Sequence, residues 1–268
     1  SIYPKISADS KNQPNIILIV ADDLGYNDIS INGNQLIETT NIDQIAKNGI
    51  NFSRAYATAS VCAPSRVAFL TGNYHQRYGF EFLPDLFNLS PRVRKADFKR
   101  FGNKDNFKQW YEKDVPINQR GLNPYVNTIG DYLKKSGYRT SIVGKWHMGT
   151  HPKYNPENFG FDQHYGISGA GSLYAPLNKE NIIESRQTWD FADFITWQVT
   201  NYYALENGQN IIPENSEYLT DVFTKKAVDF IKTNKNNSFF LHLSHMAPHG
   251  PFQAQKKYYD QFSHIKDH

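Results

Sequence analysis

The chain contains one cysteine, and the residues around it could support chemistry at an anionic group. Cys62 lies two positions before Pro64 and four positions before Arg66. Proline is favoured at the start of a helix, so we expect Cys62 at a helix N-terminus, where backbone amides and the helix dipole favour an anion. Arg66 would add a positive charge about one turn later, on roughly the same face. The alternative is that Cys62 is a small buried apolar side chain.

Two adjacent carboxylates, Asp22 and Asp23, directly follow an apolar, strand-like run. Neighbouring anions are costly unless a cation neutralises them. Hard divalent cations such as Ca²⁺ or Mg²⁺ take oxygen ligands of this kind. The pair therefore indicates a metal site, and the alternative is a turn at the end of a strand that caps a helix.

Two further polar clusters also follow strand-like runs. Lys145 and His147 come after one run, and His245 and His249 come after another. In open α/β sheets, ligands bind beyond the carboxyl ends of the strands. We therefore expect these side chains to meet the aspartate pair at one edge of a sheet, although a lysine and a histidine two positions apart are also common on ordinary surfaces. For His245, a hydrogen-bonded structural role is an equal alternative.

Helices alternate with apolar strands along the sequence. The continuous apolar run at 15–20 predicts a buried central strand. Further strands are expected at 50–57, 138–143 and 239–243, and helices at 39–49, from Cys62 onward, at 128–137 and at 217–233. This alternation predicts an α/β fold with a mostly parallel sheet covered by helices on both faces.

The segment from Cys62 to Gly72 has the pattern C-x-P-S-R-x-x-x-L-T-G. It resembles the signature of the type I, formylglycine-dependent sulfatases of the alkaline-phosphatase-like superfamily. Asp22-Asp23-Leu24-Gly25-Tyr26 and Gly144-Lys145-Trp146-His147-Met148-Gly149 resemble two more motifs of this family. The resemblance implies a large, mostly parallel mixed sheet sandwiched by helices, with 1–268 forming one N-terminal catalytic domain.

The resemblance also implies the nucleophile and the metal. In this family the cysteine is oxidised to formylglycine by a formylglycine-generating enzyme, and the aldehyde hydrates to a geminal diol. Cys62 would be this residue, and the modified Cys62, Asp22 and Asp23 would bind a divalent ion, usually calcium, with Mg²⁺ as an alternative. Further family metal ligands have no match after His249, so the resemblance predicts the N-terminal portion of a longer enzyme, with the C-terminal part of the fold absent.

The remaining site residues receive roles by the same resemblance. Lys145 would contact the sulfate and the formylglycine oxygen, and His147 would act on the diol. Arg66 would orient the formylglycine and balance its charge. His249 would face the leaving oxygen as the acid for the departing alcohol, and His245 is a weaker candidate for substrate binding.

The predicted function is hydrolysis of a sulfate ester on a sulfated oligo- or polysaccharide. Two long segments, 84–125 and 163–215, interrupt the helix–strand rhythm. Basic and aromatic residues in the first, and Tyr, Trp, Asn and Gly in the second, would suit walls that grip a sulfated sugar, or else a solvated face over minor aromatic clusters. One alternative is a phosphate or phosphonate monoester hydrolase with the same nucleophile, and another is an inactive relative that binds sulfated glycans.

Composition narrows the remaining classes of function. The net charge of +3 gives little support to nucleic-acid binding. No apolar run approaches the roughly 20 residues that a membrane span needs. A single cysteine allows no intrachain disulfide and does not fix the compartment, but the resemblance and a polymeric substrate predict a secreted or periplasmic enzyme. The oligomeric state is left open.

Overall fold

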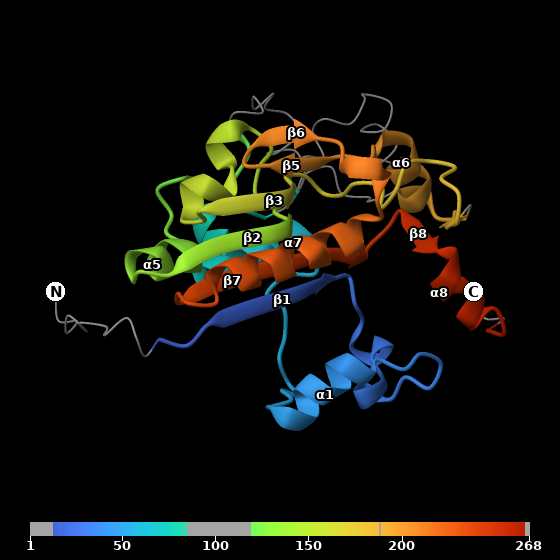
Figure 1. The fold of residues 1–268 in the computed structure, drawn as a ribbon. Helices are drawn as coiled ribbons and strands as arrows, with labels where there is room; N and C mark the ends of the chain where they lie inside the picture. Colours follow the sequence, from blue (N-terminus) through green and yellow to red (C-terminus); the bar gives the residue numbers. More distant parts are fainter. Residues whose placement is uncertain (1–12, 82, 85–118, 188, 266–268) are drawn as a thin grey trace.

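The computed structural model describes residues 13–81, 83–84, 119–187 and 189–265, in which a six-stranded mixed sheet forms the centre (Figure 1). The strand order is β1-β7-β2-β3-β5-β6, and β1, β7, β2 and β3 are parallel while β5 and β6 are antiparallel. The strands are β1 (Ile16–Asp22), β2 (Arg139–Lys145), β3 (Gln163–Ile167), β5 (Ala204–Glu206), β6 (Gln209–Ile211) and β7 (Phe239–Pro248). A separate antiparallel pair joins β4 (Ile182–Ser185) to β8 (Phe252–Gln255). The predicted α/β class with a largely parallel sheet is confirmed.

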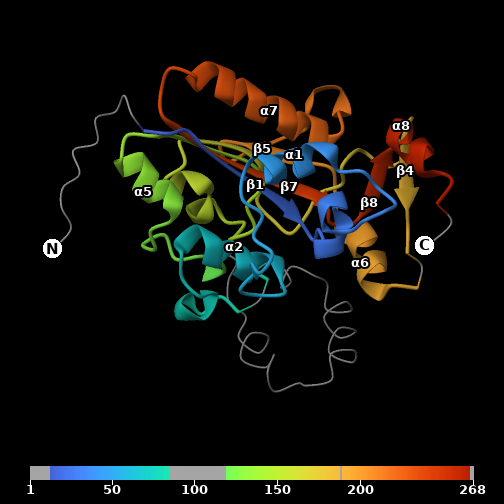
Figure 2. The same ribbon diagram turned by 90° about the horizontal axis from the view of Figure 1, so that it is seen from below.

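Helices lie on both faces of this sheet (Figure 2). The α-helices are α1 (Thr40–Asn48), α2 (Cys62–Thr71), α5 (Ile129–Lys135), α6 (Phe191–Val199), α7 (Leu219–Asn234) and α8 (Lys256–Tyr259). Short 3₁₀ helices cover Tyr26–Asp28, Ser30–Asn32, His75–Tyr78, Pro152–Tyr154, Pro156–Phe159, Glu214–Ser216 and Asp260–Phe262. Among the described residues, no helix has the length and apolarity that crossing a bilayer requires.

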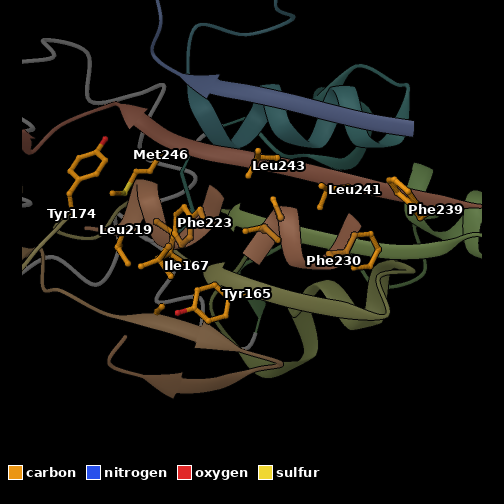
Figure 3. Close-up of a cluster of buried hydrophobic side chains, with 14 residues drawn as sticks. Tyr165, Ile167, Tyr174, Leu219, Phe223, Phe230, Phe239, Leu241, Leu243 and Met246 are labelled. Atoms are coloured by element: carbon orange, nitrogen blue, oxygen red, sulfur yellow. The ribbon is translucent and has the colours of Figure 1, made fainter. Parts of the chain in front are cut away.

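Two apolar cores fix the sheet between its helices. Successive side chains of a strand point to opposite faces, so Leu241 of β7 packs with α7 (Figure 3). Its neighbour Phe240 packs with α2 on the other face. On α7, the buried side chains recur at helical spacing and include Leu219, Phe223 and Phe230. Burying one such side chain contributes about 1.5–3 kcal/mol. These cores hold β1, β7 and β2 in register, so that their carboxyl ends lie side by side.

The sequence-predicted helices and most strands agree with the structure, but one predicted strand is absent and the predicted central position of another is wrong. Residues 50–57 form turns and irregular backbone, with no strand. The run at 15–20 does form β1, but at the edge of the described sheet, where Ile17 and Ile19 are 47% and 55% exposed. An apolar run does not show which neighbours a strand will have. In β1, only the face with Ile16 and Leu18 is packed against a core.

The segment 163–215 is part of the fold rather than an interruption of it. It supplies β3, which pairs in parallel with β2, and the antiparallel strands β5 and β6. Short strands without a strong period are weak signals in sequence, which is why they were not predicted. Most of the other predicted insertion, 84–125, lies outside the described residues.

Candidate active site

A buried ion-pair cluster lies where β1 and β2 end. The Lys145 Nζ donates to Oδ2 of Asp22, and Arg66 Nη2 lies 3.3 Å from Oδ1 of the same carboxylate. All three side chains are at most about one-twentieth exposed. Burial alone would raise the pKa of Asp22, but the charges of Lys145 and Arg66 outweigh it and lower that pKa below 3.8. Asp22 therefore stays ionised and holds both cations in place.

Ser244 on β7 completes the support of Arg66. Arg66 Nη1 donates to the Lys145 carbonyl at 2.7 Å and to Ser244 Oγ at 2.5 Å. The Ser244 hydroxyl in turn donates to the same Lys145 carbonyl at 2.7 Å. Sequence reasoning missed Ser244, because a single serine in an apolar strand carries no motif. Its only signal was its position near the predicted end of β7, beside His245.

Cys62 is the first residue of α2, after the N-cap Val61. Burial raises the pKa of its thiol, but hydrogen bonds with His147 and His249 and the nearby charges of His147 and Lys145 lower the pKa from 9.0 to about 5. The unmodified side chain would therefore be a thiolate at neutral pH. The structure thus brings the cysteine at the helix N-terminus together with side chains from the ends of β2 and β7.

Two of the polar residues sit in strained backbone immediately after or near strand ends. His147 has φ 60° and Asp23 has φ 62°, both in the left-handed region that few non-glycine residues adopt. The His147 amide donates to the Ser168 carbonyl at 3.1 Å, and its side chain is fully buried. Such conformations persist where the surroundings determine them, and they cluster at functional sites. At these two positions the chain turns away from the sheet just after β1 and just after β2.

His249 faces this cluster with a defined tautomer. Its Nδ1 lies 2.5 Å from the Gly250 carbonyl, which only accepts, so Nδ1 carries a proton. Its Nε2 lies 3.6 Å from Oδ2 of Asp23. His245 differs: burial lowers its pKa, and its Nδ1 has no hydrogen-bond partner among the described residues.

Asp22 and Asp23 provide hard oxygen donors of the kind calcium uses, but they do not form a complete site. Both oxygens of Asp22 already face cationic side chains, and Oδ2 of the exposed Asp23 carboxylate lies 3.6 Å from Nε2 of His249. Within the described ranges, no group of three or more His, Cys, Asp or Glu side chains is placed to hold a metal ion. Calcium takes six to eight oxygens. Calcium or magnesium thus stays a prediction.

The family is decided by comparison with known proteins. The sulfatase family model matches residues 14–268. The chain belongs to the sulfatase family. Curated relatives include N-acetylgalactosamine-6-sulfatase of Mus musculus, 29% identical over 94% of this chain and 43% of the relative, and that of Homo sapiens, 30% identical over 91% and 41%. This family member therefore spans less than half the length of these relatives.

Solved structures agree with the family assignment. The crystal structure of Ps i-CgsB has a TM-score of 0.68 and 34% identity, and the match covers 95% of this chain and 49% of that chain. A phosphonate monoester hydrolase of Agrobacterium radiobacter, at 16% identity and a TM-score of 0.54, shares the fold, with 93% of this chain and 44% of that chain covered. The fold therefore also occurs in a protein that is not named as a sulfatase, and the family assignment rests on the match to the sulfatase family model.

Proposed function

We propose that the protein hydrolyses sulfate esters on sulfated carbohydrates. One observation carries the proposal: Cys62 interacts with His147, His249 and Lys145, and Lys145 belongs to the same buried cluster as Arg66. Two solved relatives support the substrate class. Ps i-CgsB is known in complex with k-i-k-neocarrahexaose. BT4656, 26% identical with a TM-score of 0.57 over 88% of this chain and 35% of that chain, is known with D-glucosamine-2-N,6-O-disulfate.

The surroundings of Cys62 suit a formylglycine hydrate, which carries two hydroxyl groups. His147 and His249 both reach the side chain at position 62, so each hydroxyl would have a hydrogen-bonding imidazole nearby. The hydrate would supply one hydroxyl to attack sulfur and a second to drive the later release of sulfate. A plain thiolate at Cys62 has no second hydroxyl for that release.

Lys145 and Arg66 would stabilise the transition state. Negative charge spreads over the oxygens of the sulfuryl group as the ester bond breaks, and fixed cations in a buried site stabilise it without reorganising. Arg66 is held by Asp22, the Lys145 carbonyl and Ser244, and Lys145 is held by Asp22. Both cations are therefore oriented before a substrate arrives.

The two histidines would move the protons. Histidine titrates near neutral pH, which suits both steps. His147 would take the proton from the attacking hydroxyl at position 62. Because Nδ1 of His249 keeps its proton on the Gly250 carbonyl, the acid in this step would be the imidazolium form, which gives its Nε2 proton to the departing sugar oxygen and becomes neutral.

The test is sulfate release by the product of the complete gene, co-expressed with a formylglycine-generating enzyme and assayed on a panel of sulfated oligosaccharides. We expect sulfate release by the wild type, an aldehyde or hydrate at position 62 by mass spectrometry, and no activity in Cys62→Ala. Paired aryl sulfate and aryl phosphate substrates test the alternative that the enzyme is a phosphate or phosphonate monoester hydrolase. Faster turnover of the phosphate, or glycan binding without sulfate release by the matured protein, would overturn the proposal.

A further inference from the structure

Tyr174 is a buried residue, and its hydroxyl donates to the His249 carbonyl at 2.7 Å. It belongs to the segment after β3 and lies near the carboxyl end of β7, beside Met246 (Figure 3). We propose that Tyr174 is a positioning residue that fixes His249 for proton transfer to the leaving oxygen. This inference rests on the proposed function, because it concerns the acid of that reaction.

Tyr174 is itself held on three sides. Its ring stacks on Tyr218 with centroids 5.4 Å apart and an interplanar angle of 18°. Its amide donates to Oε1 of Gln253 at 2.8 Å, and its carbonyl accepts from the Leu219 amide at 2.8 Å. The hydroxyl therefore projects from a rigid base at the start of α7, so its hydrogen bond constrains whatever it contacts.

The same base also holds strand β8, which follows the loop that carries His249. Gln253 lies four positions after His249 and is 5% exposed. Its side chain accepts from the amides of Tyr174 and Ala175, and its carbonyl accepts from the Tyr218 hydroxyl at 2.7 Å. The tyrosine pair thus holds the β7–β8 loop at His249 and strand β8 at Gln253.

Tyr174 stays a hydrogen-bond donor under all working conditions. Burial raises the pKa of its hydroxyl, and the nearby Tyr218, Asp22 and Asp23 raise it further. The Tyr174 hydroxyl contacts the backbone of His249 rather than its imidazole. It would therefore fix the position of the imidazole and take no direct part in the proton transfer.

Loss of this hydroxyl should affect substrates according to their leaving groups. A misplacement of about 1 Å costs up to ~10²-fold in rate when geometry matters. A sugar alcohol leaves poorly and needs a proton from His249, whereas a nitrophenolate leaves without one. A general loss of structure would lower both rates by the same factor.

The test compares Tyr174→Phe with Tyr202→Phe in the matured product of the complete gene. Tyr202 is a matched control because its hydroxyl also donates to a backbone carbonyl, that of Glu217, at 2.7 Å. For Tyr174→Phe we expect a loss of about 10–100-fold in kcat on a sulfated sugar and of about threefold or less on 4-nitrophenyl sulfate. Tyr202→Phe should leave both rates unchanged. Equal losses on the two substrates in Tyr174→Phe, or no loss, would overturn the inference.

A second measurement does not depend on activity. Hydrogen exchange followed by mass spectrometry reports the loop peptide 246–252, in which the His249 amide donates to the Met246 carbonyl. We expect faster exchange of this peptide in Tyr174→Phe than in the wild type or Tyr202→Phe. Unchanged exchange would contradict the inference. If the wild type releases no sulfate at all, the proposed function fails, while the exchange experiment still decides whether Tyr174 fixes His249.

Discussion

Arg66 and Ser244 lie 178 positions apart in the chain, yet a hydrogen bond of 2.5 Å joins the guanidinium to the serine hydroxyl at the buried centre of the site. The same hydroxyl donates to the Lys145 carbonyl. Ser244 thus connects α2, β2 and β7 through one oxygen atom. Ser244 orients Arg66, which belongs to a recognisable sequence motif, although Ser244 itself belongs to none.

Ser244→Ala should therefore weaken both the fold and the proposed catalysis. The variant removes one acceptor from a buried guanidinium and one donor from a buried carbonyl, a loss of about 1–3 kcal/mol. The expected fall in kcat is roughly tenfold, because Arg66 is less firmly placed. Urea denaturation and sulfate-release kinetics measure the two effects. Ser136→Ala, at an exposed serine that bonds the Tyr132 carbonyl, is the control and should change neither.

The Lys145–Asp22 pair should tolerate removal of both charges better than removal of one. Lys145→Met leaves the buried Asp22 with Arg66 alone, and breaking a buried pair in this way costs about 3–5 kcal/mol. Asp22→Asn combined with Lys145→Met should recover part of that loss in the free energy of unfolding, but no activity. The exposed pair Lys226–Glu206 is the control, and Lys226→Met should cost less than about 1 kcal/mol. A double variant less stable than Lys145→Met would contradict this account.

The convergence of these groups could be predicted because parallel strands present their carboxyl ends at one edge. Asp22 and Lys145 follow recognisable strands, so their meeting required only the α/β pattern. Ser244 and Tyr174 could not be predicted in this way. Their contacts depend on how β7 and the segment after β3 pack in three dimensions, and neither residue has a distinctive spacing to any other site residue.

The errors in the fold have a similar origin. An apolar run such as 15–20 predicts a strand, but its exposure depends on how many neighbours pair with it and which helices cover it. Residues 50–57 alternate too weakly to specify a strand without a partner. By contrast, α1 and α5 begin where Thr39 and Thr128 predicted them. At Thr128 the reason is local, because its side chain accepts from the Gly130 amide, whereas Thr39 precedes α1 without a capping hydrogen bond from its side chain.

Gly144 should be indispensable because β2 and β7 approach closely there. Its φ is 112°, and a Cβ on this residue would lie 1.9 Å from the Ser244 carbonyl oxygen. Gly144→Ala should lower the free energy of unfolding by more than about 4 kcal/mol. Gly137→Ala is the matched control, since φ is 88° but nothing lies within 4 Å, and backbone strain alone costs about 1–2 kcal/mol. Equal effects of the two substitutions would show that the close approach is unimportant.

The unmodified Cys62 thiol should react as a thiolate in acidic solution. With a pKa of about 5, its rate of alkylation by iodoacetamide should rise through pH 5 and stay level above roughly pH 6, whereas an ordinary thiol still gains reactivity up to pH 8 and beyond. His147→Asn should move the inflection upward, because it removes the imidazole while asparagine tolerates the left-handed backbone. His151→Asn, at a histidine outside the cluster, is the control. An inflection near pH 8 or 9 in the wild type would contradict the prediction.

Stability should fall in acid partly because of two buried neutral histidines. Burial and the charge of Arg66 lower the pKa of His242 to about 3, and burial lowers that of His164 to about 4. Both values lie below the ordinary 6.5, so between pH 6.5 and these values the unfolded chain binds more protons than the folded chain. The stabilisation is therefore complete above pH 6.5 and is lost as the pH falls through that window.

For His242, the loss between pH 6.5 and 5 should be roughly 2 kcal/mol. Urea denaturation across this range measures it, and His242→Gln should flatten the profile by about that amount even if it lowers stability at every pH. His264→Asn, at an exposed histidine, should leave the slope of the profile unchanged. An unaltered slope in His242→Gln would mean that the buried imidazole does not account for the acid sensitivity between pH 6.5 and 5.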